Sequence, residues 1–262
     1  MRYFFTCILL LFTLTFSSCK QRTANKEPLE KPENILNNPT SFSNYWYKDL
    51  KLSDDFIALS PSDSVIPKGE FLKQVATGEY LPLRLISGNP VYYELYKITT
   101  PIDPLITTWL KDLGTGAYNN YQWEGKALPA INYKDIDGNI YTQQTIKGKI
   151  LVLNFWFIGC TACVAEMPDL NKLVNQYKNR KDILFVDIAI NKEDSLKKFL
   201  SKRSFDYKTV SDPSGYLLKI FKIRAWPTQV VIDKNGNIVK ILNGYNDDYK
   251  TLAALVQKVA SS

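Results

Sequence analysis

Short apolar runs alternate with polar segments through the second half of the chain, and their lengths predict strands and helices in a regular order. Ile150–Trp156 and Ile183–Ile190 are nearly continuous apolar runs, as expected of strands that are buried on both faces. Apolar residues at helical spacing predict helices over residues 162–179, Ser195–Arg203 and Tyr249–Val259. Strands and helices that alternate in this way are typical of an α/β domain.

Two further apolar runs near the C-terminus predict a hairpin. Thr228–Asp233 and Ile238–Leu242 flank Asn235-Gly236, a dipeptide that favours the tight turn between two antiparallel strands. An antiparallel pair added to the strands above gives a mixed sheet with helices on both sides. We expect this α/β domain to span residues 119–262.

The preceding region, residues 41–118, is rich in aromatic and apolar side chains, and we expect it to form a small α+β unit. Leu81–Ile86 and Val91–Ile98 predict two strands, because the turn-rich sequence Ser87-Gly88-Asn89-Pro90 separates them. We find no motif in this region that carries chemistry, so its role is unknown and is expected to lie in packing or in partner selection.

A helix is predicted near the end of the same region. Asp103 before Pro104 is a typical helix start, with the aspartate capping the first turn and proline in the first helical position. Gly114 is expected to end this helix after Leu113, since glycine is common just past a helix C-terminus.

The N-terminus has the pattern of an export signal. One positive charge precedes an apolar run that ends at Phe16, and two serines follow. The run is shorter than the roughly 20 residues that span a bilayer, so it predicts a cleaved signal peptide over residues 1–18. Cys7 lies within this signal and would be removed with it.

Cys19 follows the two serines directly. Phe16-Ser17-Ser18-Cys19 resembles the bacterial lipobox, and the resemblance implies that Cys19 is diacylated and anchors the protein to a membrane. The alternative is ordinary cleavage that leaves Cys19 as a stray thiol. Residues 19–40 contain charged residues, asparagine and three prolines but few apolar groups, which predicts a flexible tether.

Composition removes several classes of chemistry. The chain has 262 residues and no histidine, which excludes Ser-His-Asp and Cys-His catalysis and metal sites with imidazole ligands. Its net charge is +7, but acidic residues are interleaved with the lysines, so we expect a solvated surface and no nucleic-acid partner. The chain has four cysteines, so the pair that follows Cys7 and Cys19 needs an explanation of its own.

That pair, Cys160 and Cys163, lies where strand 150–156 gives way to the next predicted helix. The free N–H groups and the dipole of a helix N-terminus favour a thiolate, so we expect the pKa of Cys160 to fall below the roughly 8.5 of a free cysteine. The two-residue spacing lets the sulfurs close a disulfide. We expect Cys160 to be exposed and to attack, and Cys163 to be shielded and to resolve the mixed disulfide.

Other uses of a C-x-x-C pair fit this chain less well. A zinc site needs four ligands, and the mature domain offers neither histidine nor a further cysteine. A c-type haem site needs a histidine after the second cysteine, where Val164 stands. A structural disulfide stays open, although so short a loop contributes little stability through chain entropy. We therefore expect no metal and no cofactor.

Several landmarks in the correct order resemble one family. Asn154-Phe155-Trp156 before the cysteines, Glu166-Met167-Pro168 after them and Trp226-Pro227-Thr228 further on are similar to motifs of the thioredoxin superfamily. Within it they most resemble the membrane-anchored, extracytoplasmic TlpA/ResA-like thiol–disulfide oxidoreductases. The resemblance covers residues 119–262 and implies a thioredoxin-like fold, cysteine-containing protein substrates and an upstream thiol–disulfide electron donor.

The resemblance also implies roles by position. Pro227 is expected to be cis and to face the disulfide, with Trp226 and Thr228 completing a substrate-binding turn. Glu166 is expected to lie near the redox pair, to tune it and to exchange a proton with it. Residues expected to support the redox site are Asn154, Trp156 and Gly159.

The sequence departs from the family at a few of these positions. Gly159 stands where tryptophan usually precedes the first cysteine, and Thr161-Ala162 lacks the usual proline. Trp226 is larger than the residue often found before the cis-proline. Asn154 stands where cytoplasmic thioredoxins carry a buried aspartate, and because an amide cannot transfer a proton, Glu166 is the better candidate for that task.

The leading hypothesis is an extracytoplasmic protein-disulfide reductase, lipid-anchored in the cell envelope. Two alternatives stay open. One is a thiol peroxidase of related fold, whose attacking cysteine usually has an arginine nearby, whereas no arginine is close to Cys160 in this sequence. The other is a lipoprotein whose thioredoxin-like domain only binds partners.

Overall fold

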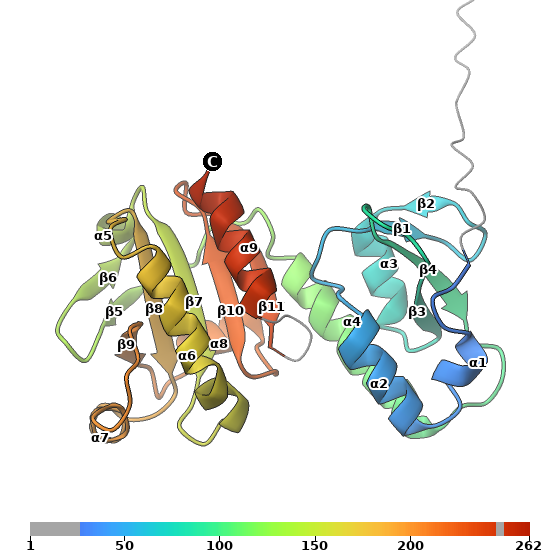
Figure 1. The fold of residues 1–262 in the computed structure, drawn as a ribbon, viewed down its shortest axis with the longest axis horizontal. Coiled ribbons are helices and arrows are strands. Elements are labelled where there is room, and N and C mark those ends of the chain that lie inside the picture. Colours follow the sequence, from blue (N-terminus) through green and yellow to red (C-terminus); the bar gives the residue numbers. More distant parts are fainter. Residues whose placement is uncertain (1–26, 245–248) are drawn as a thin grey trace, which may run out of the picture.

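The computed structural model describes residues 27–244 and 249–262, which form two units joined by one long helix (Figure 1). The N-terminal unit is built on a four-stranded sheet. Its elements are α1 (Pro32–Ile35), α2 (Pro39–Asp49), β1 (Ile57–Leu59), β2 (Val65–Ile66), α3 (Lys68–Val75), β3 (Tyr80–Arg84), β4 (Tyr92–Lys97) and α4 (Pro104–Tyr121).

The N-terminal sheet has the strand order β2-β1-β4-β3, in which β1 and β4 are parallel and the other pairs are antiparallel. The β3–β4 pair confirms the two strands predicted in this region. Buried side chains from α2, α3, α4 and the sheet form one core, which includes Phe42, Phe71, Tyr93 and Leu110. This core is separate from that of the C-terminal unit.

The tether predicted over residues 19–40 is wrong for its second half. Pro28 pairs with Leu85 beside β3, and Leu29 donates its backbone N–H to the carbonyl of Arg84 at 2.8 Å. Ile35 of α1 is buried in the N-terminal core. Backbone pairing and a few apolar side chains thus fix a segment whose composition suggested flexibility. Residues 19–26 lie outside the described part of the chain.

Helix α4 starts where predicted but continues beyond the predicted end. Asp103 accepts a hydrogen bond from the backbone N–H of Leu105 at 2.8 Å and so caps the helix. The expected stop at Gly114 is wrong, because the helix runs on to Tyr121. Gly114 serves packing instead: a Cβ atom there would lie 2.4–2.7 Å from backbone atoms of Val75 and Ala76 at the end of α3. The helix therefore crosses the expected boundary after residue 118.

The C-terminal unit contains the predicted mixed sheet. Its strand order is β11-β10-β7-β8-β9, with β7, β8 and β9 parallel and β10 antiparallel to both of its neighbours. The elements are β5 (Asn132–Lys134), β6 (Ile140–Thr142), α5 (Gln143–Ile146), β7 (Ile150–Trp156), α6 (Thr161–Gln176), β8 (Ile183–Ala189), α7 (Glu193–Leu200), β9 (Lys208–Ser211), α8 (Tyr216–Phe221), β10 (Thr228–Ile232), β11 (Ile238–Asn243) and α9 (Tyr249–Ala260).

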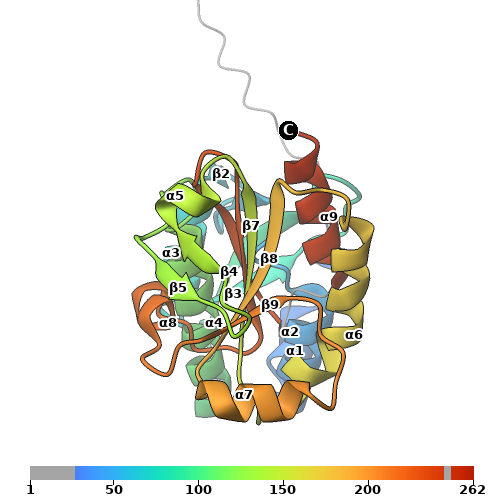
Figure 2. The same cartoon turned by 90° about the vertical axis from the view of Figure 1, so that its left-hand side faces the viewer.

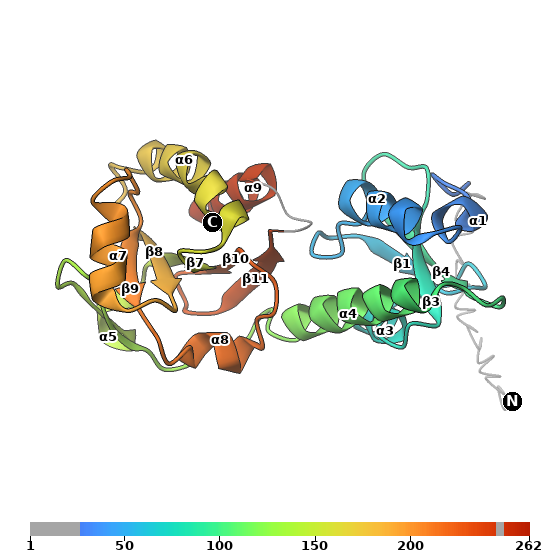
Figure 3. The same cartoon turned by 90° about the horizontal axis from the view of Figure 1, so that it is seen from below.

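Different helices cover the two faces of this sheet (Figures 2 and 3). Along β7, Leu153 and Phe155 join a core shared with α8, whereas Ile150 and Val152 join a core shared with α6 and α9. Successive strand residues point to opposite faces, so a strand that is covered on both sides is apolar throughout. The mixed sheet flanked by helices is therefore confirmed.

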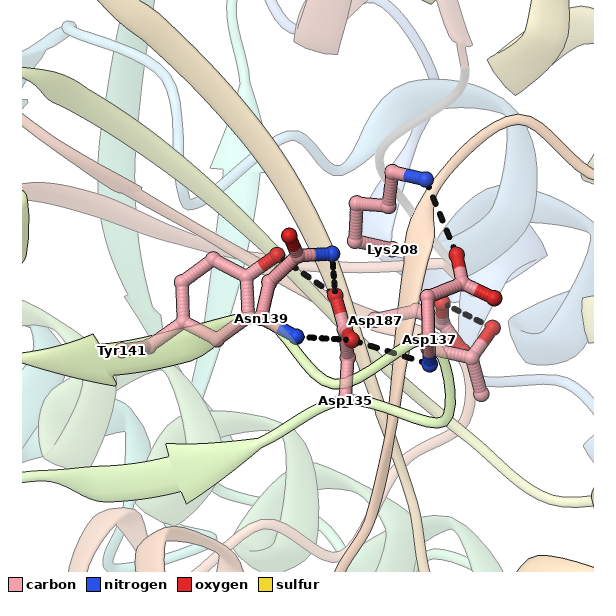
Figure 4. A network of polar contacts seen from close by, with 7 residues as sticks. Asp135, Asp137, Asn139, Tyr141, Asp187 and Lys208 are labelled. Carbon is pink, nitrogen blue, oxygen red and sulfur yellow. Dashed lines mark hydrogen bonds and ion pairs between the residues drawn. The ribbon is translucent and has the colours of Figure 1, made fainter.

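A polar network orders the turn of the β5–β6 hairpin, and one ion pair of this network joins the hairpin to the edge strand β9 (Figure 4). Asp135 accepts hydrogen bonds of 2.8–3.0 Å from the backbone of Asp137 and Asn139 and from the side chains of Asn139 and Tyr141. Burial raises the pKa of Asp135, but these donors outweigh burial, and the pKa lies below its usual value. Lys208 of β9 pairs with Asp137 at 2.9 Å.

The two units meet where the end of α4 contacts β11. Lys240 of β11 is buried, and its Nζ lies 2.9 Å from Oδ1 of Asp55 in the N-terminal unit. The hydrogen bond from Lys240 holds the pKa of Asp55 below its usual value. This ion pair adds a polar contact between the units beside the helix that connects them.

Candidate redox site

The two cysteines lie at the N-terminus of α6, directly after the loop that follows β7. They form a disulfide with an S–S distance of 2.03 Å. Cys160 is the N-cap residue of α6, and its Sγ accepts a hydrogen bond from the backbone N–H of Cys163 at 3.1 Å. The helix therefore presents a backbone N–H donor and the positive end of its dipole to Cys160.

The expectation that Cys160 is exposed is wrong, because the residue is buried in the structure. Cys160 is only 8% exposed and Cys163 is 1% exposed, so Cys160 is the more exposed residue, as predicted, but both residues are buried. The reason is the apolar surroundings: both cysteines belong to one buried cluster with Trp156 and Met167. Cys160 remains the more accessible of the two.

Aromatic side chains from two loops pack around this cluster. Trp156 at the end of β7 is completely buried within it. Phe157 and Trp226 contact each other edge to face, with ring centroids 5.2 Å apart, and both pack against the cluster. Gly159 is exposed, and a Cβ atom there would lie 3.3 Å from the ring of Phe157. The loop before Cys160 and the turn at Trp226 thus form one apolar surface.

The turn at Trp226–Pro227 has the cis peptide bond that was predicted. Thr228 is buried, and its hydroxyl donates to the carbonyl of Ala225 at 2.7 Å, so its side chain supports the turn. Gly244 packs on the other side of the turn: a Cβ atom there would lie 2.5 Å from Cγ of Pro227.

Glu166 lies one helical turn after Cys163 and faces the sheet. Both of its carboxylate oxygens accept hydrogen bonds from Nε2 of Gln229, at 3.0 and 3.3 Å. The same amide lies 3.4 Å from Oδ1 of Asn154, which is buried on the neighbouring strand. Burial raises the pKa of Glu166 to about 8, although the hydrogen bond from Gln229 opposes the shift.

The sequence interpretation missed Gln229 and a second acid near the cysteines, Asp187 of β8. Asp187 is completely buried, and its carboxylate accepts hydrogen bonds from the indole N–H of Trp156 and from the hydroxyl of Thr209, the latter at 2.8 Å. Burial raises the pKa of Asp187 to about 7. The available signal was a lone aspartate inside the apolar run 183–190.

A cavity of about 290 Å³ is lined by residues of both units. One wall is the segment Lys222–Ala225, which leads directly into the turn at Trp226. The opposite wall comes from the N-terminal unit and includes Trp46 and Tyr121. The N-terminal unit thus borders the segment that precedes the predicted substrate-binding turn.

Several predictions fall on residues outside the described part of the chain. These are the signal peptide over residues 1–18, with Cys7, and the lipidation of Cys19. Within residues 27–244 and 249–262, helices are too short or too polar to cross a membrane.

A C-x-x-C disulfide at the start of a helix, directly after the central strand of a mixed sheet, is the arrangement of thioredoxin-like thiol–disulfide oxidoreductases. Comparison with known proteins agrees with this class. The sequence model of the AhpC/TSA family matches residues 125–241. The chain belongs to the family of thiol–disulfide oxidoreductases that the ResA proteins represent, and it is itself a thiol–disulfide oxidoreductase.

The relatives themselves are bacterial. The thiol-disulfide oxidoreductase ResA of Bacillus thuringiensis is 30% identical over 121 residues, which cover 46% of this chain and 69% of the relative. ResA of Geobacillus thermodenitrificans is 31% identical over 142 residues, covering 52% and 81%. The thioredoxin domain of a thiol-disulfide oxidoreductase from Bacteroides vulgatus matches with 28% identity and a TM-score of 0.45, covering 52% of this chain and 96% of that domain.

Proposed function

We propose that this chain reduces disulfides in exported, cysteine-containing proteins, with Cys160 as the attacking residue and Cys163 as the resolving residue. The observation that carries the proposal is the position of Cys160, whose Sγ caps α6 and accepts the N–H of Cys163. In the dithiol form the same donor and the helix dipole would stabilise a thiolate on Cys160. Cys160 is also the more exposed of the two residues.

The proposed reaction is a pair of thiol–disulfide exchanges. The Cys160 thiolate attacks one sulfur of the substrate disulfide, the substrate S–S bond breaks, and the departing sulfur takes up a proton. Cys163 then loses its proton and attacks Cys160, which releases the second substrate sulfur. The substrate gains two electrons and two protons, the enzyme is left as the disulfide, and an upstream dithiol protein returns it to the reduced form.

Glu166 is proposed to carry the proton of the resolving cysteine. The position of Glu166 one turn after Cys163 supports this role. A carboxyl with a pKa of about 8 is protonated below pH 8 and ionised above it, so it can both give up and take up a proton near neutral pH. The apolar turn at Trp226 and Pro227 is proposed to bind an extended substrate chain beside Cys160. Asn154, Trp156 and Gly159 are proposed to support the site.

Export and anchoring are part of the proposal. The signal-like segment over residues 1–18 and the lipobox-like sequence before Cys19 support a lipid-anchored protein of the cell envelope. Residues 41–118 are proposed to act in packing or partner selection, and the cavity they share with the segment 222–225 supports the second of these roles.

Trapping of a mixed disulfide tests the roles of the two cysteines. The variants Cys163→Ala and Cys160→Ala are incubated in reduced form with insulin, and mixed disulfides are counted by mass spectrometry. Cys163→Ala is expected to retain insulin chains, because the resolving sulfur is missing, whereas Cys160→Ala is expected to retain none. Equal trapping by the two variants contradicts the assignment. Faster consumption of hydrogen peroxide than of insulin disulfides by the reduced protein would favour the thiol peroxidase alternative.

A further inference from the structure

A row of buried polar side chains crosses the central sheet beneath α6. Strand pairing sets Gln229 of β10 opposite Asn154 of β7, Asn154 opposite Asp187 of β8, and Asp187 opposite Thr209 of β9. All four are at most 3% exposed. Glu166 of α6 bonds to the Gln229 end of the row, so the row contacts the proposed redox machinery there.

Asp187 connects the row to the disulfide by a second route. The indole N–H of Trp156 donates to one oxygen of Asp187, and the hydroxyl of Thr209 donates to the other. Neither donor carries a charge, so the carboxylate is buried without a cationic hydrogen-bond partner. Trp156 packs in the same buried cluster as Cys160 and Cys163. Asp187 is therefore hydrogen-bonded to a side chain of the cluster that contains the redox pair.

Other titratable groups lie close to Asp187. The negative charge of Asp135, beyond β9, contributes to the raised pKa of Asp187. The charge of Asp187 in turn raises the pKa of Tyr141 of β6 and of Tyr207, which precedes β9. The charge of Glu166 also raises the pKa of Tyr207, so both acids act on this side chain. Its hydroxyl is buried and has no hydrogen-bond partner within the described residues. A buried polar atom of this kind is a typical position for an internal water.

We propose that Asp187 is a positioning residue of the redox site, which orients Trp156 against the cysteine pair and takes up a proton when the disulfide is reduced. This inference rests on the proposed function of the two cysteines. Reduction by a dithiol protein places two electrons on the sulfurs and oxidises the donor to its disulfide. One of the two accompanying protons is held by Cys163. The other is held by the Asp187 carboxyl while Cys160 stays a thiolate.

The proposal predicts a specific pH dependence. Below about pH 6, Asp187 is protonated in both redox states and does not affect the equilibrium. Above about pH 8 it is ionised, and its charge opposes the thiolate of the reduced form. An Asp187→Asn variant lacks this charge, so its dithiol form should be favoured relative to wild type only at the higher pH, by about tenfold if the interaction is worth about 1.4 kcal/mol.

The experiment measures the equilibrium between the full chain and a glutathione redox buffer from pH 5 to pH 9. The ratio of the equilibrium constants of Asp187→Asn and wild type should be flat below pH 6, rise between pH 6 and 8, and level off. Trp156→Phe removes the N–H that joins Asp187 to the site, so its effect should not add to that of Asp187→Asn. Thr209→Val removes a hydrogen bond that lowers the pKa of Asp187, so it should move the rise to higher pH.

The outcomes separate this proposal from the proposed function. A pH-independent ratio, or additive effects of Asp187→Asn and Trp156→Phe, overturns the role of Asp187 even when Cys163→Ala still traps insulin. Loss of insulin trapping by Cys163→Ala instead overturns the function of the cysteine pair. Urea unfolding of each variant at pH 6 checks folding, and Thr209→Val, which keeps the carboxyl, supplies the test if Asp187→Asn does not fold.

Discussion

Glu166→Gln is expected to stabilise the folded protein at alkaline pH, because the wild-type carboxyl resists ionisation where it lies. Burial raises the pKa of Glu166 from its usual value of 4.5 to about 8. The difference of about 3.5 pKa units corresponds to about 5 kcal/mol, at about 1.4 kcal/mol per unit, and this is an upper limit for the effect on stability. The glutamine side chain can still accept the hydrogen bond of Gln229.

The raised pKa of Glu166 determines how the stability of the wild type changes with pH. Below about pH 4.5 the carboxyl is protonated in the folded and the unfolded chain, so wild type and Glu166→Gln differ little through this group. Between pH 4.5 and 8 the unfolded chain ionises first, and the wild type loses stability as the pH rises. Above pH 8 the loss is complete. The variant has no such group and should not lose stability in this window.

Urea unfolding of the oxidised protein at several pH values measures the effect. The difference in unfolding free energy between Glu166→Gln and wild type should grow by several kcal/mol from pH 5 to pH 9. Glu70→Gln is the matched control, since Glu70 is exposed on α3, and its curve should run parallel to wild type. Parallel curves for Glu166→Gln as well would refute the claim that this carboxyl is destabilised by burial.

Two further predictions concern close backbone approaches. Gly114→Ala should destabilise the protein by about 1–3 kcal/mol, because its Cβ would overlap the backbone of α3, whereas Gly116→Ala in the same helix has open space and should stabilise it by about 0.5–1 kcal/mol. Urea unfolding distinguishes them, and the same sign for both contradicts the packing role of Gly114. Gly244→Ala should displace the ring of Pro227 and slow insulin reduction by about tenfold to a hundredfold. Gly88→Ala, which meets no atom within 4 Å, is its control, and an unchanged rate for Gly244→Ala argues against a role of this turn in substrate binding.

Elements with a strong local pattern could be predicted from the sequence. Strand β7 has the bounds that its apolar run indicated, and the hairpin of β10 and β11 turns at Asn235-Gly236. In both cases the signal lies within the element itself, in its periodicity or in a dipeptide that favours one turn.

Predictions failed where contacts distant in sequence decide the outcome. Gly114 carries a local signal for a helix end, but α3, some forty residues earlier, approaches so closely that only glycine fits within a continuing helix. The residues after 26 have the composition of a tether, yet pairing of Pro28 with Leu85 fixes them to the N-terminal sheet. Neither partner could be identified before the strands and helices were placed.

The acidic residues near the cysteines were also predicted incompletely, because their positions depend on contacts distant in sequence. Because an amide cannot transfer a proton, Asn154 led to the expectation that Glu166 is the better candidate for proton exchange near the cysteines. The register of β7 and β8 sets Asp187 directly opposite Asn154, so a second buried carboxyl lies in that layer of the sheet. A buried acid without a cationic partner lowers stability when it ionises, and an apolar residue would fill the place without this loss. Asp187 lies on the buried polar row and bonds to Trp156, which packs with the cysteines, and Glu166 bonds to the Gln229 end of that row. The proton exchange proposed for reduction gives both acids a role, whereas stability gives them none.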